Sequence, residues 1–151
     1  PGGGGADHLR AIVEGLLPEV RRRYRVETAP DRVALAGSSL GGLMSLYGGW
    51  SHPDTFGRIA ALSPSIWWAD RAVVRMVRTR PRPPLDLVYA DMGTLESGGL
   101  PDLGALGAAL EDAGFAPGRD LFVEEIRAGQ HDERSWRRRL PAVLERLFPA
   151  R

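Results

Sequence analysis

Cysteine, lysine and long apolar runs are all missing from this chain of 151 residues. Without cysteine there is no disulfide, no thiol nucleophile and no cysteine-bound metal. All twenty basic residues are arginine, so a lysine nucleophile or a Schiff base is excluded as well. No apolar run approaches the roughly 18 residues that a membrane-spanning helix needs. None of the patterns that are present implies a metal or an organic cofactor.

An excess of charge is also missing, since twenty basic residues face nineteen acidic ones and the formal net charge is +1. This balance gives no electrostatic reason to expect nucleic acid or a membrane surface as a partner. The chain begins at Pro1, and neither a charged leader nor a hydrophobic signal core follows. We therefore expect a cytoplasmic protein that acts on a small molecule and whose start is processed or trimmed.

What the chain does contain is an alternation of helical periodicity with short apolar strands. This pattern is typical of a parallel sheet covered by helices on both faces. Asp7 is expected to cap a first helix that Pro18 kinks. We predict one α/β domain over residues 1–151, with a flexible glycine-rich start at 1–5. The expected helices are 7–24, 40–50, 69–79, 103–113 and 133–147, and the expected strands are 32–36, 58–62, 85–90 and 121–126.

The most informative motif is Gly37-Ser38-Ser39-Leu40-Gly41, which lies directly between an expected strand and an expected helix. A strand, a Gly-x-Ser-x-Gly turn and a helix in this order form a nucleophile elbow, which lifts the serine hydroxyl above the sheet edge on strained backbone. Gly37 and Gly41 are expected to be glycine because side chains there would collide with the neighbouring strand and helix. Ser39 is the predicted nucleophile, and the N–H of Leu40 is the predicted oxyanion donor.

Ligands of open parallel sheets bind at the carboxyl ends of the strands, so the residues just past each strand are the candidates for the rest of the site. Among them are a possible base and a possible acid. His131 follows the last expected strand in a glycine-bounded loop, whereas His8 lies in a helix and His52 in a turn typical of the surface. Glu96 lies in the loop where the acid of such a site usually sits, and Asp91 at the end of the strand is the alternative. Serine, acid and histidine follow one another in the chain order of a hydrolase triad.

These three groups would act as a unit on a carbonyl carbon. A serine hydroxyl is a weak nucleophile and needs a base to take its proton as it attacks. Imidazole can take that proton and later deliver it to the leaving alcohol. The carboxylate holds the ring in the correct tautomer and stabilises its charged form.

Other residues near the predicted site have plainer interpretations. Trp67 and Trp68 follow the second strand; they could be ordinary core or lid aromatics, but at least one is expected to line the substrate pocket. Asp102 is expected to cap the next helix. A solvated helix face, rather than a binding patch, is expected from Arg134, Arg137, Arg138 and Arg139.

These motifs resemble the "putative esterase" family of α/β-hydrolases, which includes enterochelin (ferric-siderophore) esterases, esterase D-like enzymes, feruloyl and acetylxylan esterases and mycolyltransferases. The paired tryptophans and the His-Asp-Glu ending look most like the enterochelin esterase-like group. The resemblance covers nearly the whole chain and is carried by 38–43, 52–54, 63–68, 93–96 and 131–136.

The resemblance implies a three-layer α/β-hydrolase-type sandwich with a mostly parallel sheet. It implies a serine carboxylic-ester hydrolase that works through an acyl-enzyme on siderophore-type or sugar-linked esters. Acyl transfer to a sugar alcohol instead of water stays open, because only the second acceptor differs. By resemblance Ser39 would be the nucleophile, His131 the base and Glu96 the acid. Some siderophore esterases of the family use a Ser-His dyad without the acid.

The chain departs from the family pattern in one respect. Family members carry further strands ahead of the first helix, with the loop that gives a second oxyanion N–H, and residues 1–31 cannot supply these. The expected strands thus resemble the C-terminal portion of the fold, and the nucleophile strand would expose an apolar edge. We expect this edge to pair with a missing amino-terminal segment or with another copy of the chain. The alternative to an esterase is a weak or inactive hydrolase-like fragment that acts as a binding or assembly module.

Overall fold

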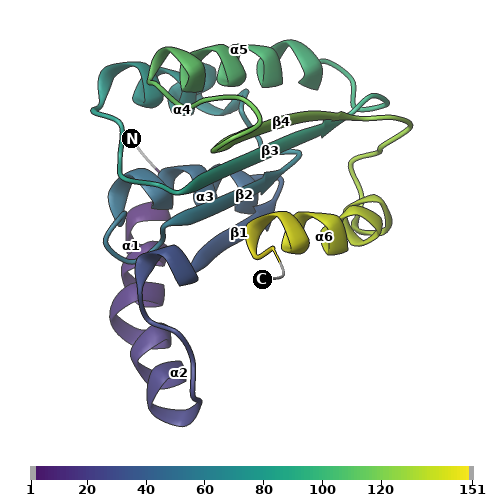
Figure 1. The fold of residues 1–151 in the computed structure, drawn as a ribbon. Coiled ribbons are helices and arrows are strands. Elements are labelled where there is room, and N and C mark those ends of the chain that lie inside the picture. The colour runs from purple at the N-terminus through teal and green to yellow at the C-terminus, as the bar shows by residue number, and fades with distance from the viewer. Residues whose placement is uncertain (1–2, 150–151) are drawn as a thin grey trace.

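The computed structural model describes residues 3–149, which form a four-stranded sheet with helices on both of its faces (Figure 1). The strands stand in the order β1-β2-β3-β4, and every neighbouring pair is parallel. This confirms the predicted α/β architecture. The strands are β1 Ala34–Ser38, β2 Arg58–Leu62, β3 Leu87–Gly93 and β4 Leu121–Ile126.

The helices account for most of the remaining chain. Within residues 3–149, none of them combines the length and the hydrophobicity that crossing a bilayer would require. They are α1 Gly5–Arg10, the π-helical η1 Ala11–Leu16, α2 Leu17–Arg23, the 3-10 turn η2 Pro30–Arg32, α3 Leu40–Ser51, α4 Trp68–Thr79, α5 Gly99–Asp112 and α6 Glu133–Leu147.

Alternating side chains of the central strands divide the core into two layers. On β2, Ile59 and Ala61 pack in the layer that includes residues of α3, α4 and α5, whereas Ala60 and Leu62 pack with residues of α6. Residues of β3 alternate in the same way between the two clusters. Both faces of these strands are therefore buried, which explains why they read as continuous apolar runs in the sequence.

The predicted boundaries agree closely with the observed ones except at the first strand, the third strand and helix α5, which begins at Gly99, four residues before the predicted start at Leu103. The elements 58–62, 121–126 and 133–147 begin and end where predicted. Strand β1 begins two residues later than predicted, because Arg32 still belongs to the 3-10 turn η2 that starts at Pro30. Strand β3 extends beyond its predicted end to Gly93, where it pairs with Ile126 of β4.

The first helix differs from the prediction at its start. Gly5 is its first residue and Gly4 its N-cap, and Asp7 instead pairs with Arg10, so the prediction that Asp7 caps the helix is wrong. From there α1, η1 and α2 follow one another without a break, and Pro18 lies in the first turn of α2. Of the glycine-rich start predicted to be flexible, residues 1–2 lie outside the described residues.

Helix α4 begins with a left-handed turn, which its sequence did not predict. Ala69, Asp70 and Arg71 have φ values of 49°, 55° and 56°, a conformation that costs L-residues roughly 1–2 kcal/mol each. The Arg71 guanidinium binds Asp102 of α5 at 2.6 Å. Since the N-cap of α5 is Gly98, the prediction that Asp102 caps this helix is wrong.

The tight packing of α3 on β2 leads to a prediction for Gly49. A Cβ at Gly49 would lie 2.7 Å from Cγ1 of Ile59 and 3.2 Å from Cδ1 of Leu85. Gly49→Ala should therefore lower the free energy of unfolding by about 1–3 kcal/mol, measured by urea denaturation. Gly104→Ala is the matched control, because Gly104 is exposed in α5 and its Cβ would meet nothing within 4 Å. The control should be neutral or stabilising by up to about 1 kcal/mol, and equal losses in both variants would contradict the packing argument.

Candidate active site

Ser39 stands at the turn from β1 into α3, with φ 57° and ψ −121°. Its N–H donates to the carbonyl of Leu62 at 2.9 Å, and its carbonyl accepts from the N–H of Ser65 at 3.0 Å. The strained residue is thus held on both sides by the end of β2 and the loop that follows it. A non-glycine residue persists at such a φ only when its surroundings fix it.

The two glycines of the motif have different surroundings. A Cβ at Gly37 would lie 2.6 Å from the backbone of Gly41, which confirms that only glycine fits there. At Gly41 the expectation is wrong, since a Cβ there would meet nothing within 4 Å. A side chain at position 37 would therefore collide with the backbone of Gly41, whereas a side chain at position 41 would not collide with Gly37.

Ser39, His131 and Glu96 come together at the carboxyl ends of the strands. His131 Nε2 lies 2.9 Å from Ser39 Oγ, and His131 Nδ1 lies 2.7 Å from Glu96 Oε2. A carboxylate can only accept, so Nδ1 donates to Glu96 and Nε2 is left to accept the hydroxyl proton of Ser39. The parallel register brings the three loops that follow β1, β3 and β4 to one edge of the sheet.

Hydrogen bonds hold Glu96 in its ionised form. Burial alone would raise its pKa, but the bonds from the Ser63 hydroxyl, from His131 and from the Gly93 N–H outweigh burial and keep the pKa of Glu96 below its ordinary value. The Ser63 and Gly93 donors lie 2.6 Å and 2.8 Å from Glu96 Oε1. The acid is therefore charged near neutral pH, as the tautomer assignment of His131 requires.

Asp91, the alternative acid, lies deeper and does not contact His131. It is fully buried in β3, where it accepts from the Ser63 N–H at 3.0 Å and from the Tyr89 hydroxyl at 2.9 Å. Burial raises the pKa of Asp91, although the charge of Arg139 works against this rise. Of the two candidate acids, the structure brings Glu96 to the imidazole.

The loops that carry Glu96 and His131 touch through two glycines. A Cβ on Gly93 would overlap the carbonyl of Gly129 and would also lie 2.7 Å from Glu96 Oε1. The Leu95 N–H donates to the Gly129 carbonyl at 3.0 Å, which ties the two loops together. The part that Gly129 plays here could not be predicted, because a lone glycine in a loop does not reveal which other loop approaches it.

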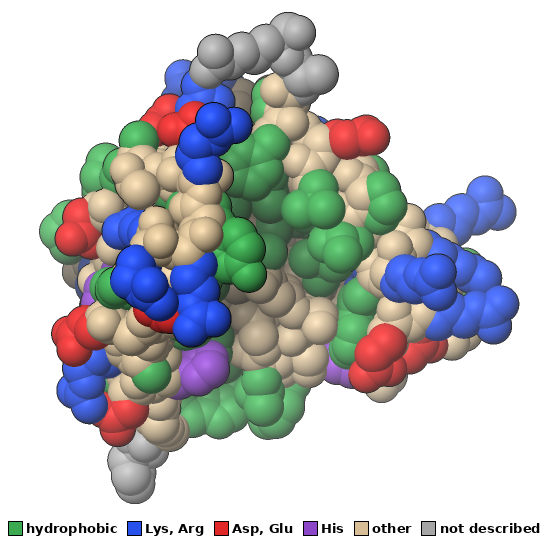
Figure 2. All heavy atoms as spheres, turned by 90° about the horizontal axis from the view of Figure 1, so that it is seen from below, with side chains coloured by type: hydrophobic (Ala, Val, Ile, Leu, Met, Phe, Trp, Pro, Cys, Tyr) green, Lys and Arg blue, Asp and Glu red, His purple; other side chains and the backbone are tan. Residues whose placement is uncertain are grey.

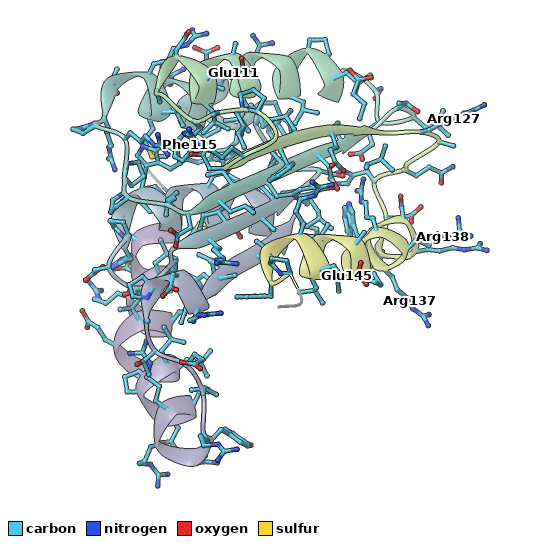
Figure 3. The ribbon with its side chains drawn as sticks, viewed as in Figure 1. Glu111, Phe115, Arg127, Arg137, Arg138 and Glu145 are labelled. Atoms are coloured by element: carbon cyan, nitrogen blue, oxygen red, sulfur yellow. The ribbon has the colours of Figure 1, made fainter. Side chains whose placement is uncertain are left out.

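The predicted solvated face of α6 is wrong for one of its four arginines. Arg139 is only 8% exposed, and its Nη2 donates to Ser63 Oγ at 2.6 Å. The signal for this burial was present, since Trp136, Arg139 and Val143 recur at helical spacing on one face. The other three arginines, at 134, 137 and 138, are exposed as expected, and Figure 3 shows Arg137 and Arg138 pointing away from the molecule.

The predicted oxyanion and substrate-binding residues lie around Ser39. Leu40 is the first residue of α3, where backbone N–H groups have no partner within the helix. Trp67 is 67% exposed and Trp68 is partly buried; both follow Ser65, whose Oγ lies 3.3 Å from Ser39 Oγ. The loop with the tryptophans therefore adjoins the serine, and Trp67 is free to contact a bound molecule.

This parallel sheet, its elbow serine, and a histidine and an acid on later loops define an α/β-hydrolase-type protein. The chain belongs to the "Putative esterase" family, whose model matches residues 1–147.

Individual relatives agree with this assignment. The iron(III) enterobactin esterase of Dickeya dadantii is 29% identical over 143 residues, which cover 84% of this chain and 32% of that protein. The iron(III) enterobactin esterase of Escherichia coli K12 is 39% identical over 66 residues, 44% of this chain and 16% of that protein. The crystal structure of the enterochelin esterase of Shigella flexneri superposes with a TM-score of 0.84 at 28% identity, over 95% of this chain and 37% of that one. The chain thus spans about a third of the length of the Dickeya and Shigella proteins.

The contact between Gly93 and Gly129 leads to a prediction about Ser39 reactivity. Gly93→Ala should push the loop of Glu96 away from the loop of His131 and break the bond between these two side chains. A displacement of about 1 Å at such a site costs roughly 100-fold in rate, so a fluorophosphonate should label Ser39 about 100-fold more slowly. The rate is measured by intact-mass spectrometry, with Gly104→Ala as the control. Unchanged labelling of a folded Gly93→Ala variant would contradict the argument.

Proposed function

We propose that this chain carries the active site of a serine esterase that cleaves carboxylic esters through an acyl-enzyme. In this proposal Ser39 is the nucleophile, His131 the general base and Glu96 the acid. The observation that supports it most is the unbroken hydrogen-bond chain from Ser39 Oγ through the ring of His131 to Glu96, at 2.9 Å and 2.7 Å. The named activity of the enterobactin esterase relatives supports it independently.

The reaction would proceed in two halves around His131. In the first, Nε2 takes the Ser39 proton while Oγ attacks the ester carbonyl, and the Leu40 N–H donates to the oxyanion that forms. Nε2 then gives the proton to the leaving alcohol as the carbon–oxygen bond breaks, which leaves the acyl group on Ser39. In the second half a water loses its proton to Nε2, attacks the acyl carbon and releases the acid, and Ser39 regains its proton.

The proposed substrate is an ester of the siderophore type. The Dickeya and Shigella relatives are named for enterobactin or enterochelin, and each aligns with more than four fifths of this chain. Trp67 next to the Ser39 loop offers a flat apolar surface against which an aromatic part of such a molecule can pack. No part of the site implies a metal or an organic cofactor for this chemistry.

The open edge of β1 is part of the same proposal, because it borders the strand that carries Ser39. β1 pairs only with β2 among the described residues, and Ala36 on it is exposed. Figure 2 shows hydrophobic side chains gathered on the underside of the molecule, where Figure 1 places this border. A groove of about 290 Å³ runs beside it, lined by His8, Leu9, Ile12, Leu35, Ala36, Leu40, Gly41, Met44 and Ser45. Further large hydrophobic side chains on the flanking helices and their ends are exposed: Leu16, Tyr24, Leu140, Leu144 and Phe148.

We propose that a further strand of a longer chain covers this edge. The relatives are about three times longer than the part that matches, so they hold ample chain for such a strand. An apolar sheet edge exposes backbone N–H and C=O groups that can form hydrogen bonds with a further strand. The alternative is that a second copy of the chain covers the β1 edge, and the hydrogen-exchange experiment below distinguishes the two.

Substitution of Ser39 tests the esterase proposal directly. Ser39→Ala should abolish both fluorophosphonate labelling and hydrolysis of an activated aryl ester. Ser97→Ala should retain both, because Ser97 is an exposed serine whose side chain forms no hydrogen bond among the described residues. Hydrolysis that persists in Ser39→Ala would end the proposal. A wild-type chain with no labelling at all would favour the binding or assembly module. A single oxyanion donor is worth about 10²–10³ in turnover, so a weak esterase remains within the proposal.

Hydrogen exchange tests the occupant of the β1 edge. In the 151-residue chain alone, the β1 amides that do not face β2 should exchange rapidly, because they have no partner there. In a longer protein that includes a covering strand, the same amides should be protected. Protection in the isolated chain together with a discrete dimer in sedimentation equilibrium would assign the edge to a second copy instead.

A further inference from the structure

A buried polar cluster lies directly behind Glu96. Ser63, the first residue after β2, is 1% exposed and has a φ of 42°. Its hydroxyl oxygen lies 2.6 Å from Glu96 Oε1, 3.0 Å from Trp136 Nε1 and 2.6 Å from Arg139 Nη2. We call these four residues, together with Asp91, the Ser63 cluster.

The direction of every hydrogen bond at Ser63 Oγ follows from the chemistry of its neighbours. The indole of Trp136 and the guanidinium of Arg139 can only donate, so both must donate to Ser63 Oγ. A hydroxyl has two acceptor lone pairs and one proton, and these two bonds fill both lone pairs. The proton of Ser63 therefore points to Glu96 Oε1.

This assignment decides which oxygen of Glu96 serves the imidazole. Oε1 accepts from both the Ser63 hydroxyl and the Gly93 N–H. Oε2 is the oxygen that remains for Nδ1 of His131, at 2.7 Å. A carboxyl group that carried a proton could not accept all of these bonds, so the cluster favours the ionised acid.

Arg139 supplies the charge that lets two buried carboxylates lie close together. Its Nη1 lies 3.4 Å from Asp91 Oδ1, and its Nη2 lies 3.8 Å from Glu96 Oε1. Two neighbouring carboxylates without a cation between them would repel each other and favour protonation of one. On its other side Asp91 accepts from the Tyr89 hydroxyl, which also lies 3.3 Å from Glu124. Arg139 is the cation within 4 Å of Asp91 among the described residues.

Helix α6 connects this cluster to the base. Trp136 and Arg139 are neighbours on its buried face, and the helix begins two residues after His131. The Trp136 ring meets the His131 ring edge to face, with 4.9 Å between centroids and 82° between planes. One side chain thus contacts the base directly and, through Ser63, the acid.

We propose that Ser63 and Arg139 are positioning residues for the acid of the site. Arg139, with Trp136, fixes the hydroxyl of Ser63 so that its proton goes to Glu96 Oε1, and this selects Oε2 for His131 and holds the carboxylate in line with Ser39. The inference rests on the proposed esterase function, and it adds to the three proposed reacting side chains two that act on Glu96 and make no side-chain hydrogen bond to Ser39 among the described residues.

Kinetics and proton NMR of variants in the full chain test the inference. Ser63→Ala and Arg139→Met should each lower kcat on an activated aryl ester about 10- to 100-fold, the range that one hydrogen bond to a charged group corresponds to, with KM within twofold. Arg139→Lys should recover part of the loss, because it keeps the charge but not the planar fork. Arg138→Met, an exposed neighbour on the same helix, should keep the wild-type rate.

The far-downfield resonance of the His131 Nδ1 proton reports the bond to Glu96. In the wild type, burial raises the pKa of Glu96, but the Ser63 bond and the other donors outweigh burial and keep the pKa below its ordinary value. Without that bond Glu96 should take up its proton at a higher pH, and the resonance should vanish at a higher pH during acid titration. A purely structural serine would change the melting temperature but neither the titration nor kcat.

The outcomes separate the two proposals. Residual hydrolysis in Ser39→Ala overturns the esterase function itself. An inactive Ser39→Ala together with wild-type kcat and titration in Ser63→Ala overturns the positioning inference alone. If Arg139→Met does not fold, Ser63→Ala and Trp136→Phe decide, since the latter keeps an aromatic ring next to His131 but removes one donor to Ser63. A folded Trp136→Phe with an unchanged resonance would count against the inference.

Discussion

The parallel register of four short strands is the constraint on which the rest of the structure depends. Ser38 stands opposite Leu62, and Leu62 stands opposite Asp91, so the residues that follow β1 and β2 emerge side by side with the end of β3. A slip of one residue would turn every side chain of a strand to the other face. The two buried layers forbid such a slip, and hydrophobic burial thereby sets where the hydroxyl, the imidazole and the carboxylate stand.

Hydrogen bonds from polar groups behind the site fix the position of Glu96 more closely than hydrophobic burial alone. Glu96 is held by the Ser63 hydroxyl, the Gly93 N–H and His131, and each donor belongs to a different segment of the chain. Loss of any of these donors would be costly, because it would leave a buried oxygen of Glu96 with fewer partners. The strained φ of Ser39 and Ser63 belongs to the same arrangement, since both residues stand at strand ends that neighbouring loops fix.

The sequence predicted what depends on local pattern. The elbow, the parallel α/β class and most element boundaries follow from periodicity, glycine spacing and strand composition. Contacts between distant segments could not be predicted from it: the contact of Arg139 with Ser63, the contact of Gly93 with Gly129 and the ion pair of Asp102 with Arg71 each join segments that only the fold brings together. The prediction that a side chain at Gly41 would collide was wrong for a related reason, because the motif does not show which of its two glycines is crowded.

The left-handed opening of α4 has a consequence for how the rim of the site is shaped. Three successive residues that reverse the helical hand rotate the peptide planes directly after the paired indoles, and Arg71 at the end of this turn is tied to Asp102 of α5. The turn directly follows Trp67 and Trp68, and through Arg71 it is joined to α5 by an ion pair. A substitution at Asp102 would therefore remove a support of the backbone next to the paired tryptophans while leaving Ser39, His131 and Glu96 themselves unchanged.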